Sequence, residues 1–105
     1  MGFRIKFTEQ AEEDLSSIIT YIRDDLHSPW AARRFYNEVN KKLSKISDNP
    51  FMYPLSRNEK LRAMGYHTAT IRNYLLFYIV DETNRSVYIP RIVYGKRDLT
   101  SISEE

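Results

Sequence analysis

Basic and tyrosine side chains gather in the second half of the sequence, and their types could do chemistry. The basic residues are Arg57, Lys60, Arg62, Arg72, Arg91, Lys96 and Arg97, and the tyrosines are Tyr66, Tyr74, Tyr78, Tyr88 and Tyr94. Arginine grips phosphate through two parallel hydrogen bonds, and tyrosine stacks on unpaired bases. Such a set could bind nucleic acid, or clamp a phosphate while a Lys, Tyr or His of depressed pKa moves protons. The simpler interpretation places the tyrosines on the faces of a sheet, covered by the arginine stems.

Other kinds of site find little support in the sequence. The chain has no cysteine, which excludes a disulfide, a thiolate metal site and a thiol nucleophile. His27 and His67 stand apart from any partner at metal-ligand spacing, and the three glycines form no phosphate-binding loop. We expect His27 in the loop between the helices, and His67 as a surface or partly packed strand residue rather than a catalyst. Any catalysis would therefore use neither a metal nor another cofactor.

Length and charge set the organisation of the chain. A chain of 105 residues has room for one hydrophobic core, so we expect a single domain over residues 1–105. No apolar run is long enough to span a bilayer, and we expect a cytoplasmic protein without membrane contact. The net charge is only +2, but residues 28–80 carry nine basic and three acidic side chains. One face could therefore meet an anionic partner.

The first half of the chain predicts a strand and a helix hairpin. Residues 3–7 alternate apolar and basic, which is typical of a strand with one buried face. Thr8 can cap a helix whose apolar stripe is Ala11, Leu15, Ile18, Ile22 and Leu26, with acids in its first turns. A serine and a proline at positions 28 and 29 begin a second helix that ends near residues 48–50. Two such helices joined by a few residues form an antiparallel hairpin.

The second half predicts an irregular connection, residues 49–60, followed by three strands. These strands are residues 66–72, residues 74–80 and residues 87–94. The middle one is apolar throughout, so we expect a central strand buried on both faces. Pro90 cannot donate to a ladder, which predicts a bulge or an unpaired side there. The fold class is α+β: β-α-α-β-β-β, with a long antiparallel helix hairpin packed on a small, mainly antiparallel sheet.

Five stretches give the sequence a family resemblance. They are residues 3–15 (FRIKFTEQAEEDL), Tyr21-Ile22 in the first helix, Pro50 after the second, residues 73–78 (NYLLFY) and residues 91–98 (RIVYGKRD). In this order, and along nearly the whole chain, they resemble the RelE/ParE toxin superfamily. The resemblance implies a toxin of a type II toxin–antitoxin module with the fold derived above. It also implies that a flexible segment of a cognate antitoxin wraps the toxin and inactivates it.

The resemblance leaves three activities open. RelE-like members cleave mRNA on the ribosome as metal-free endoribonucleases, whereas ParE-like members inhibit DNA gyrase without a hydrolytic site of their own. A third possibility is a non-toxic subunit that only binds the antitoxin or acts as a co-repressor at the operator.

Position 75 separates the first two activities. RelE-like nucleases tend to place an arginine just after the tyrosine that opens the central strand, but Leu75 follows Tyr74 here. Leucine cannot hold a phosphate, and losing such a cation costs several kcal/mol of transition-state stabilisation. Arg97 matches a basic residue of the RelE-like cleavage site, whereas residues 101–103 offer no tyrosine or histidine. Together with the long hairpin, this favours a ParE-like gyrase inhibitor.

If the chain is an mRNA interferase instead, the sequence offers a set of catalytic candidates. These are Arg62, Arg72, Arg91, Tyr94, Lys96 and Arg97, with His67 as a further possible substitute.

Overall fold

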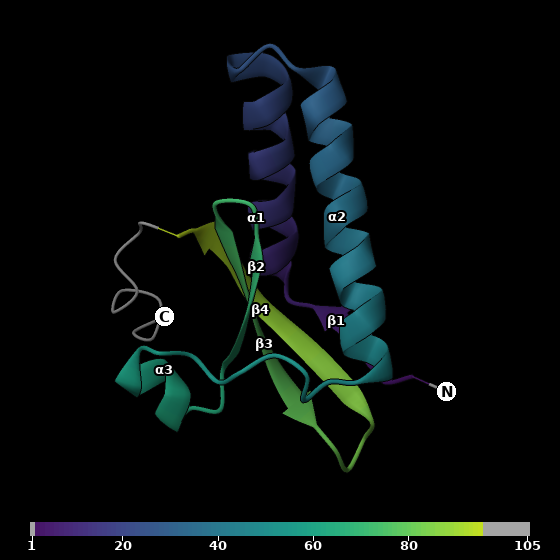
Figure 1. Ribbon diagram of the computed structural model, residues 1–105, viewed down its shortest axis with the longest axis vertical. Helices are drawn as coiled ribbons and strands as arrows, with labels where there is room; N and C mark the ends of the chain where they lie inside the picture. Colours follow the sequence, from purple (N-terminus) through teal and green to yellow (C-terminus); the bar gives the residue numbers. More distant parts are fainter. Residues whose placement is uncertain (1, 96–105) are drawn as a thin grey trace.

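The chain follows the predicted order of elements, with two additions. The computed structural model describes residues 2–95. Its elements are β1 (Arg4–Phe7), α1 (Glu9–Thr20), the π-helical turn η1 (Tyr21–Asp25), α2 (Pro29–Asp48), α3 (Glu59–Ala63), β2 (His67–Ile71), β3 (Tyr74–Asp81) and β4 (Ser86–Tyr94). The additions are η1, which extends α1, and the short helix α3. The architecture is α+β, a helix hairpin on an open sheet, as predicted (Figure 1).

The four strands form one sheet in the order β1-β4-β3-β2. β1 is parallel to β4, and the other neighbours are antiparallel. β3 is therefore an interior strand, and its residues Leu76, Phe77 and Tyr78 are fully buried. This confirms the prediction of a central strand buried on both faces. The parallel pair needs a long crossover, part of which the helix hairpin supplies.

Each long helix begins at the predicted cap. The Thr8 hydroxyl accepts a hydrogen bond from the Ala11 amide at 3.1 Å, and the Ser28 hydroxyl accepts one from the Ala31 amide at 3.2 Å. Both bonds satisfy amides that have no partner within the helix. Pro29 occupies the first turn of α2, where a missing N–H costs nothing. These local signals fix where the two arms of the hairpin begin.

The end of the first arm differs from the prediction. In η1 the helix widens, and the Leu26 amide donates to the Tyr21 carbonyl five residues earlier. This wider turn holds one residue more than an α-helical turn and rotates the end of the helix. Ile22 therefore stays buried, while Leu26 is 55% exposed. The prediction of Leu26 in the buried stripe is therefore wrong. His27 then reverses the chain with a φ of 53°, in the loop where it was expected. This tip of the hairpin projects beyond the sheet (Figure 1).

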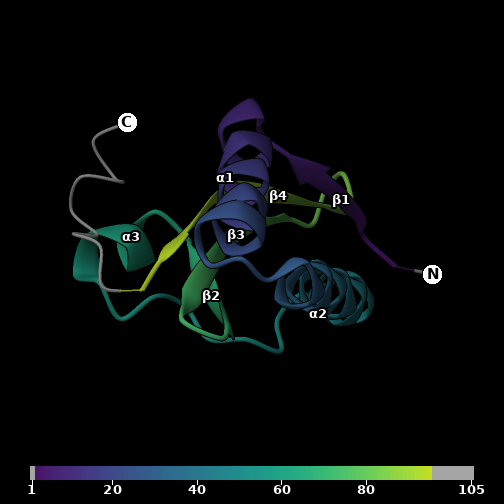
Figure 2. The same ribbon diagram turned by 90° about the horizontal axis from the view of Figure 1, so that it is seen from above.

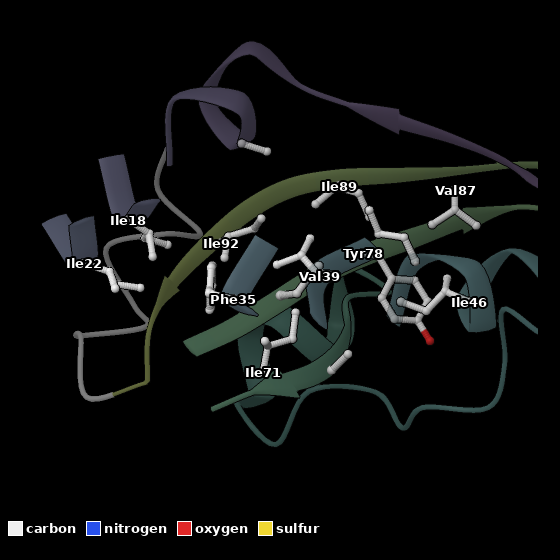
Figure 3. Packing of buried hydrophobic residues seen from close by; sticks show 14 of the residues in the cluster. Ile18, Ile22, Phe35, Val39, Ile46, Ile71, Tyr78, Val87, Ile89 and Ile92 are labelled. Atoms are coloured by element: carbon white, nitrogen blue, oxygen red, sulfur yellow. The ribbon is translucent and has the colours of Figure 1, made fainter. Parts of the chain in front are cut away.

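The main core lies between the hairpin and one face of the sheet (Figures 2 and 3). Its labelled members are Ile18 and Ile22 from the first arm, Phe35, Val39 and Ile46 from α2, and Ile71, Tyr78, Val87, Ile89 and Ile92 from the strands. A smaller cluster of Leu61, Tyr66, Phe77 and Val93 lies on the opposite face, where α3 contributes its leucine. Alternate residues of β3 therefore serve two separate clusters.

Pro90 marks the place where β4 loses a neighbour. The last β1–β4 pair joins Phe7 to Ile89, and the β3–β4 register shifts between Phe77 and Ile79, opposite this point. The predicted irregularity at Pro90 is thus confirmed. The Thr8 hydroxyl lies 3.2 Å from the Ile89 carbonyl and 3.0 Å from the Pro90 carbonyl, as their potential donor.

Beyond Pro90, a side chain of α1 takes the place of the missing strand. The Asp14 carboxylate accepts hydrogen bonds from the Ile92 amide at 3.0 Å and from Arg91 Nε at 2.9 Å. The Asp14 and Arg91 side chains are only 9% and 7% exposed. Burial acts to raise the pKa of Asp14, but hydrogen bonds from Arg91, Gln10 and Ile92 outweigh it and hold the pKa below its ordinary value. From the sequence, Asp14 was only one of the acids in the first turns of this helix, where the helix dipole favours a negative charge.

Candidate functional site

The β2–β3 turn and the end of β4 bring two of the predicted site residues together. Arg72 and Tyr94, with Asn73 between β2 and β3, line both of two neighbouring cavities of about 220 and 320 Å³. The Gly95 amide donates to the Asn73 carbonyl at 2.8 Å, which holds the two chain segments against each other. We take this end of the sheet, called the turn-end site below, as the candidate functional site.

Arg72 is positioned by the turn and by α2. Its φ of 55° lies in the left-handed region, which is uncommon for a residue other than glycine. Its guanidinium donates through Nε and an η nitrogen to Glu38 Oε1, at 3.2 and 2.7 Å. Both partners are partly exposed, so this ion pair is worth at most about 1 kcal/mol. Glu38 therefore orients Arg72 but leaves it able to meet a second anion.

The tyrosines of the site form a ladder of edge-to-face contacts. Tyr74 lies between Phe35 and Tyr94, with ring centroids 5.2 and 5.7 Å away. Burial raises the pKa of Tyr74, and the neighbouring Tyr21 and Tyr94 raise it further. Tyr74 therefore stays protonated at neutral pH, when its hydroxyl can donate a hydrogen bond but cannot serve as a base.

The hairpin supplies the opposite wall. Tyr21, Leu26 and Arg34 line the larger cavity, and the Arg34 guanidinium lies 4.3 Å from the ring centroid of Trp30. Taken together, the described residues that line one cavity or the other include two arginines and three tyrosines but no histidine and no carboxylate. The described residues thus provide cations, aromatic faces and hydrogen-bond donors, which suit binding better than proton transfer.

Of the remaining candidates, Arg62 and Arg91 lie away from the turn-end site. Arg62 is exposed on α3, which precedes β2 and lies at the opposite end of that strand from the turn (Figure 1). Arg91 is buried against Asp14, and Lys96 and Arg97 lie outside the described residues. Their roles at a phosphate, like those of Arg72 and Tyr94, stay predictions.

His67 is partly packed on its strand, which agrees with the expectation from the sequence. Its ring stacks on Tyr78 at 4.9 Å, and Nδ1 lies 2.8 Å from the Tyr53 carbonyl oxygen. Because a carbonyl only accepts, Nδ1 carries the proton. The contact ties β2 to the loop before α3 and places the imidazole away from the turn-end site.

Two residues of the site were missed by the sequence reasoning. Arg34 lay on the polar face of a helix, and Tyr21 was noted only for the family resemblance. Helical periodicity says which face is exposed, but it does not say which exposed residue another element approaches. Leu75, singled out from the sequence, lines the smaller cavity and so stands in the site wall.

Among the described residues, no group of three or more His, Cys, Asp or Glu side chains could hold a metal ion. None of the described helices is long and apolar enough to cross a membrane.

Comparison with solved structures places the fold. A chain of the chromosomal ParDE TA system from P. aeruginosa superposes with a TM-score of 0.70 at 18% identity, covering 90% of this chain and 97% of that one. A chain of the RelBE2 toxin–antitoxin complex from Mycobacterium tuberculosis gives 0.61 at 23% identity, covering 90% and 99%. The free E. coli toxin RelE, as a mutant, gives 0.61 at 19% identity, covering 100% and 94%. These likenesses confirm the RelE/ParE-like fold.

Sequence comparison identifies the family. No curated protein matches the sequence. Residues 5–99 match the family described as the ParE toxin of the type II toxin–antitoxin system parDE. The matched range contains all of the structural elements except the first residue of β1, and it includes the turn-end site. The chain therefore belongs to the ParE toxin family of type II toxin–antitoxin systems.

Proposed function

We propose that this toxin acts by binding DNA gyrase and inhibiting it, and that a cognate antitoxin neutralises it. The observation that carries the proposal is the composition of the turn-end site. Leu75 stands in its wall where RelE-like nucleases tend to have an arginine, and its described lining offers no imidazole or carboxylate to move a proton. An acid–base mechanism would lack its usual partners there.

The projecting tip of the hairpin offers a surface for a large target. Trp30 is 67% exposed, and Tyr21 and Leu26 also present much of their apolar surface. Exposed aromatic residues beside arginines are typical anchors of protein interfaces. The tip therefore adds a protein-binding surface next to the turn-end site.

The antitoxin partner is supported by the family and by the solved relatives. One related structure is the chromosomal ParDE TA system and another is the RelBE2 toxin–antitoxin complex. We expect this toxin to co-purify with the product of an adjacent small gene, and the purified pair to be inactive. Failure of the two products to associate would remove this part of the proposal.

A supercoiling assay tests the proposed target. Purified toxin added to gyrase and relaxed plasmid should abolish supercoiling, and the antitoxin should restore it. Trp30→Ser should weaken inhibition about tenfold or more, because it removes an exposed aromatic anchor at little cost to the core. Phe51→Ser, which removes an exposed ring after α2, is the matched control. Full supercoiling at a large excess of toxin would refute the proposed target.

Cleavage of mRNA is the second candidate, because Arg72 and Tyr94 line the same cavities. Induction of the toxin followed by mapping of mRNA 5′ ends would reveal it. New cuts in ribosome-bound messages, with supercoiling intact, would replace the gyrase proposal by this one. A chain that causes no growth arrest without antitoxin would instead be the non-toxic subunit.

A further inference from the structure

The two arms of the helix hairpin carry opposite charge. The first arm, α1 with η1, has six acidic side chains and one basic side chain over residues 9–25. The second arm, α2, has five basic side chains and two acidic ones. The arms lie side by side, so the hairpin is negative along one arm and positive along the other (Figures 1 and 2). A charge distribution of this kind directs an anionic partner to α2.

Four long side chains of α2 form a straight row, called the α2 stripe below. They follow one another at spacings of four, three and four residues, which places them on one face of the helix. They are Arg34, Glu38, Lys41 and Lys45. The three basic residues among them are exposed, and the half-buried Lys42 borders the stripe. At 1.5 Å per residue the stripe is about 16 Å long.

The single carboxylate of the α2 stripe is covered by a cation from the sheet. Arg72, in the turn between β2 and β3, donates two hydrogen bonds to Glu38 Oε1, at 3.2 and 2.7 Å. A cavity of about 130 Å³ beside this pair is also lined by Lys41, Lys42 and Lys45. Glu38 is the only carboxylate among the described residues that line it. Because Arg72 compensates Glu38, the stripe presents positive charge along its whole length.

We propose that the α2 stripe binds the phosphate backbone of duplex DNA. About 16 Å of duplex carries roughly nine phosphate charges, so a straight row of cations meets phosphates at any position along the duplex. Contacts with phosphates carry no sequence information, so this binding does not depend on the DNA sequence. The acidic first arm is repelled by the duplex, and the molecule therefore approaches it with α2.

The choice of DNA rests on the proposed function, because gyrase acts on duplex DNA. Trp30, the proposed anchor on gyrase, lies four residues before Arg34 and so on the same face of α2. The Arg34 guanidinium lies 4.3 Å from the Trp30 ring centroid, where the tip joins the stripe. A toxin anchored on gyrase through its tip therefore turns the α2 stripe toward DNA that the enzyme holds.

Two other polyanions fit the α2 stripe less well. Proteins hold single-stranded nucleic acid largely by stacking its bases on aromatic rings, and residues 38–45 of α2 include no aromatic residue. An acidic protein segment gains little from exposed charge pairs alone, and the same eight residues present no exposed apolar side chain beside them. Both polyanions become outcomes of the test.

The probe is a fluorescein-labelled DNA duplex of about 20 base pairs and arbitrary sequence, titrated with the full chain between about 50 and 200 mM salt. Binding is followed by fluorescence polarisation with no gyrase present. Four cations at phosphates, Arg34, Lys41, Lys42 and Lys45, predict a slope of about −3.6 when log K is plotted against log salt. Absence of binding at the lowest salt concentration, or a slope near zero, would overturn the proposal without the use of any variant.

Two double variants locate the binding. Lys41→Ala with Lys45→Ala should weaken binding more than about tenfold at 0.1 M salt and flatten the slope by about 1.8. Alanine is the best helix former, so α2 should be retained. The control, Arg4→Ala with Lys6→Ala, loses the same charge from the face of the sheet away from the hairpin, since the alternate residues of β1 pack on the main core. The control should keep the original slope, and equal weakening by the two variants would overturn the assignment to the stripe.

A second pair of variants tests the compensation of Glu38. Glu38→Gln should strengthen binding several-fold, because it removes the one negative charge of the stripe and releases Arg72 to meet a phosphate. Glu13→Gln removes the same charge from exposed surface on α1 and should change binding much less. Equal strengthening by both variants would mean that only net charge matters, and it would overturn the proposal.

Competing ligands and gyrase complete the test. Tighter binding of an RNA duplex, or of a glutamate-rich peptide, than of the DNA duplex would overturn the proposal in favour of that polyanion. Because the binding measurements contain no gyrase, their failure leaves the proposed target standing. Uninhibited supercoiling in the presence of a chain that binds DNA would instead refute the proposed target and leave the DNA site in place.

Discussion

Replacing Asp14 by asparagine tests the claim that one side chain completes the edge of the sheet. In the native chain its carboxylate accepts from Arg91 Nε at 2.9 Å, from an Arg91 η nitrogen at 3.3 Å and from the Ile92 amide at 3.0 Å. An asparagine has the same size but no charge and only one acceptor oxygen. Its amide nitrogen would face the Arg91 guanidinium or the Ile92 amide, which can only donate.

The expected cost follows from the burial of the pair. Removing one partner of a buried ion pair typically destabilises a protein by about 3–5 kcal/mol, because the remaining charge loses its compensation. Asparagine keeps one acceptor for Ile92 or Arg91, so we place the loss near the lower end, at about 3 kcal/mol. Asp24→Asn is the matched control, since its pair with Arg23 is 54% and 51% exposed. Such an exposed pair contributes little to stability, because water screens the two charges.

Urea unfolding followed by circular dichroism measures both variants against the original chain. We expect the midpoint to fall much further for Asp14→Asn than for Asp24→Asn, with similar slopes. A double variant, Asp14→Leu with Arg91→Met, should recover much of the loss, because it removes both buried charges together. Equal destabilisation by the two asparagine variants would refute the role assigned to Asp14.

Three further measurements test other contacts. The pKa of Asp14 is lower in the folded chain than in the unfolded chain, so its stabilisation is present above about pH 4 and is lost as the pH falls through the folded-state pKa. The unfolding free energies of the original chain and of Asp14→Asn should therefore converge when they are measured at decreasing pH. Tyr78→Phe should cost about 1–2 kcal/mol by urea unfolding, since it removes a buried 2.8 Å hydrogen bond to the Pro50 carbonyl. Burial raises the pKa of Tyr78 to about 12, so its phenol ionises at a lower pH in the unfolded chain than in the folded chain. The free energy of unfolding should therefore fall between about pH 10 and pH 12 in the original chain, and it should fall less in Tyr78→Phe, which has no phenol at this position. Thr8→Ala should lower the free energy of unfolding by about 1–2 kcal/mol, more than Ser28→Ala does, because Thr8 caps α1 and also reaches the carbonyls of β4. Equal losses of stability for the two variants in thermal unfolding would contradict this.

The elements of the fold were largely predictable because their signals are local. Apolar periodicity and the caps at Thr8 and Ser28 located both long helices, and an apolar run located β3. The helix α3 was missed because five residues are too few to show a period, although Asn58 before Glu59 was an available signal. The π-helical turn η1 was missed for a different reason. It changes the helix by one residue without leaving a mark in the apolar pattern.

The site was less predictable because separate elements assemble it. Arg72 and Tyr94 were both candidates, but nothing in the sequence indicated that they share a cavity while Arg62 and Arg91 do not. Arg91 illustrates the difficulty most directly. A basic residue at the end of a strand fits an anion site equally well whether the anion is a phosphate or a carboxylate of the same chain. The structure places Asp14, 77 residues away in sequence, beside it.

This internal ion pair also bears on how the turn-end site is held in place. Asp14 bonds to Arg91 and Ile92, and Tyr94 follows Ile92 by two residues on the same strand. Tyr94 in turn packs on Tyr74, which packs on Phe35 of α2. Both arms of the hairpin therefore contact the end of the sheet, α1 through a charge and α2 through an aromatic ring. A change at Asp14 should consequently disturb the surface around Tyr94 as well as stability. Loss of toxicity in an Asp14 variant would for that reason be no evidence that the carboxylate takes part in chemistry.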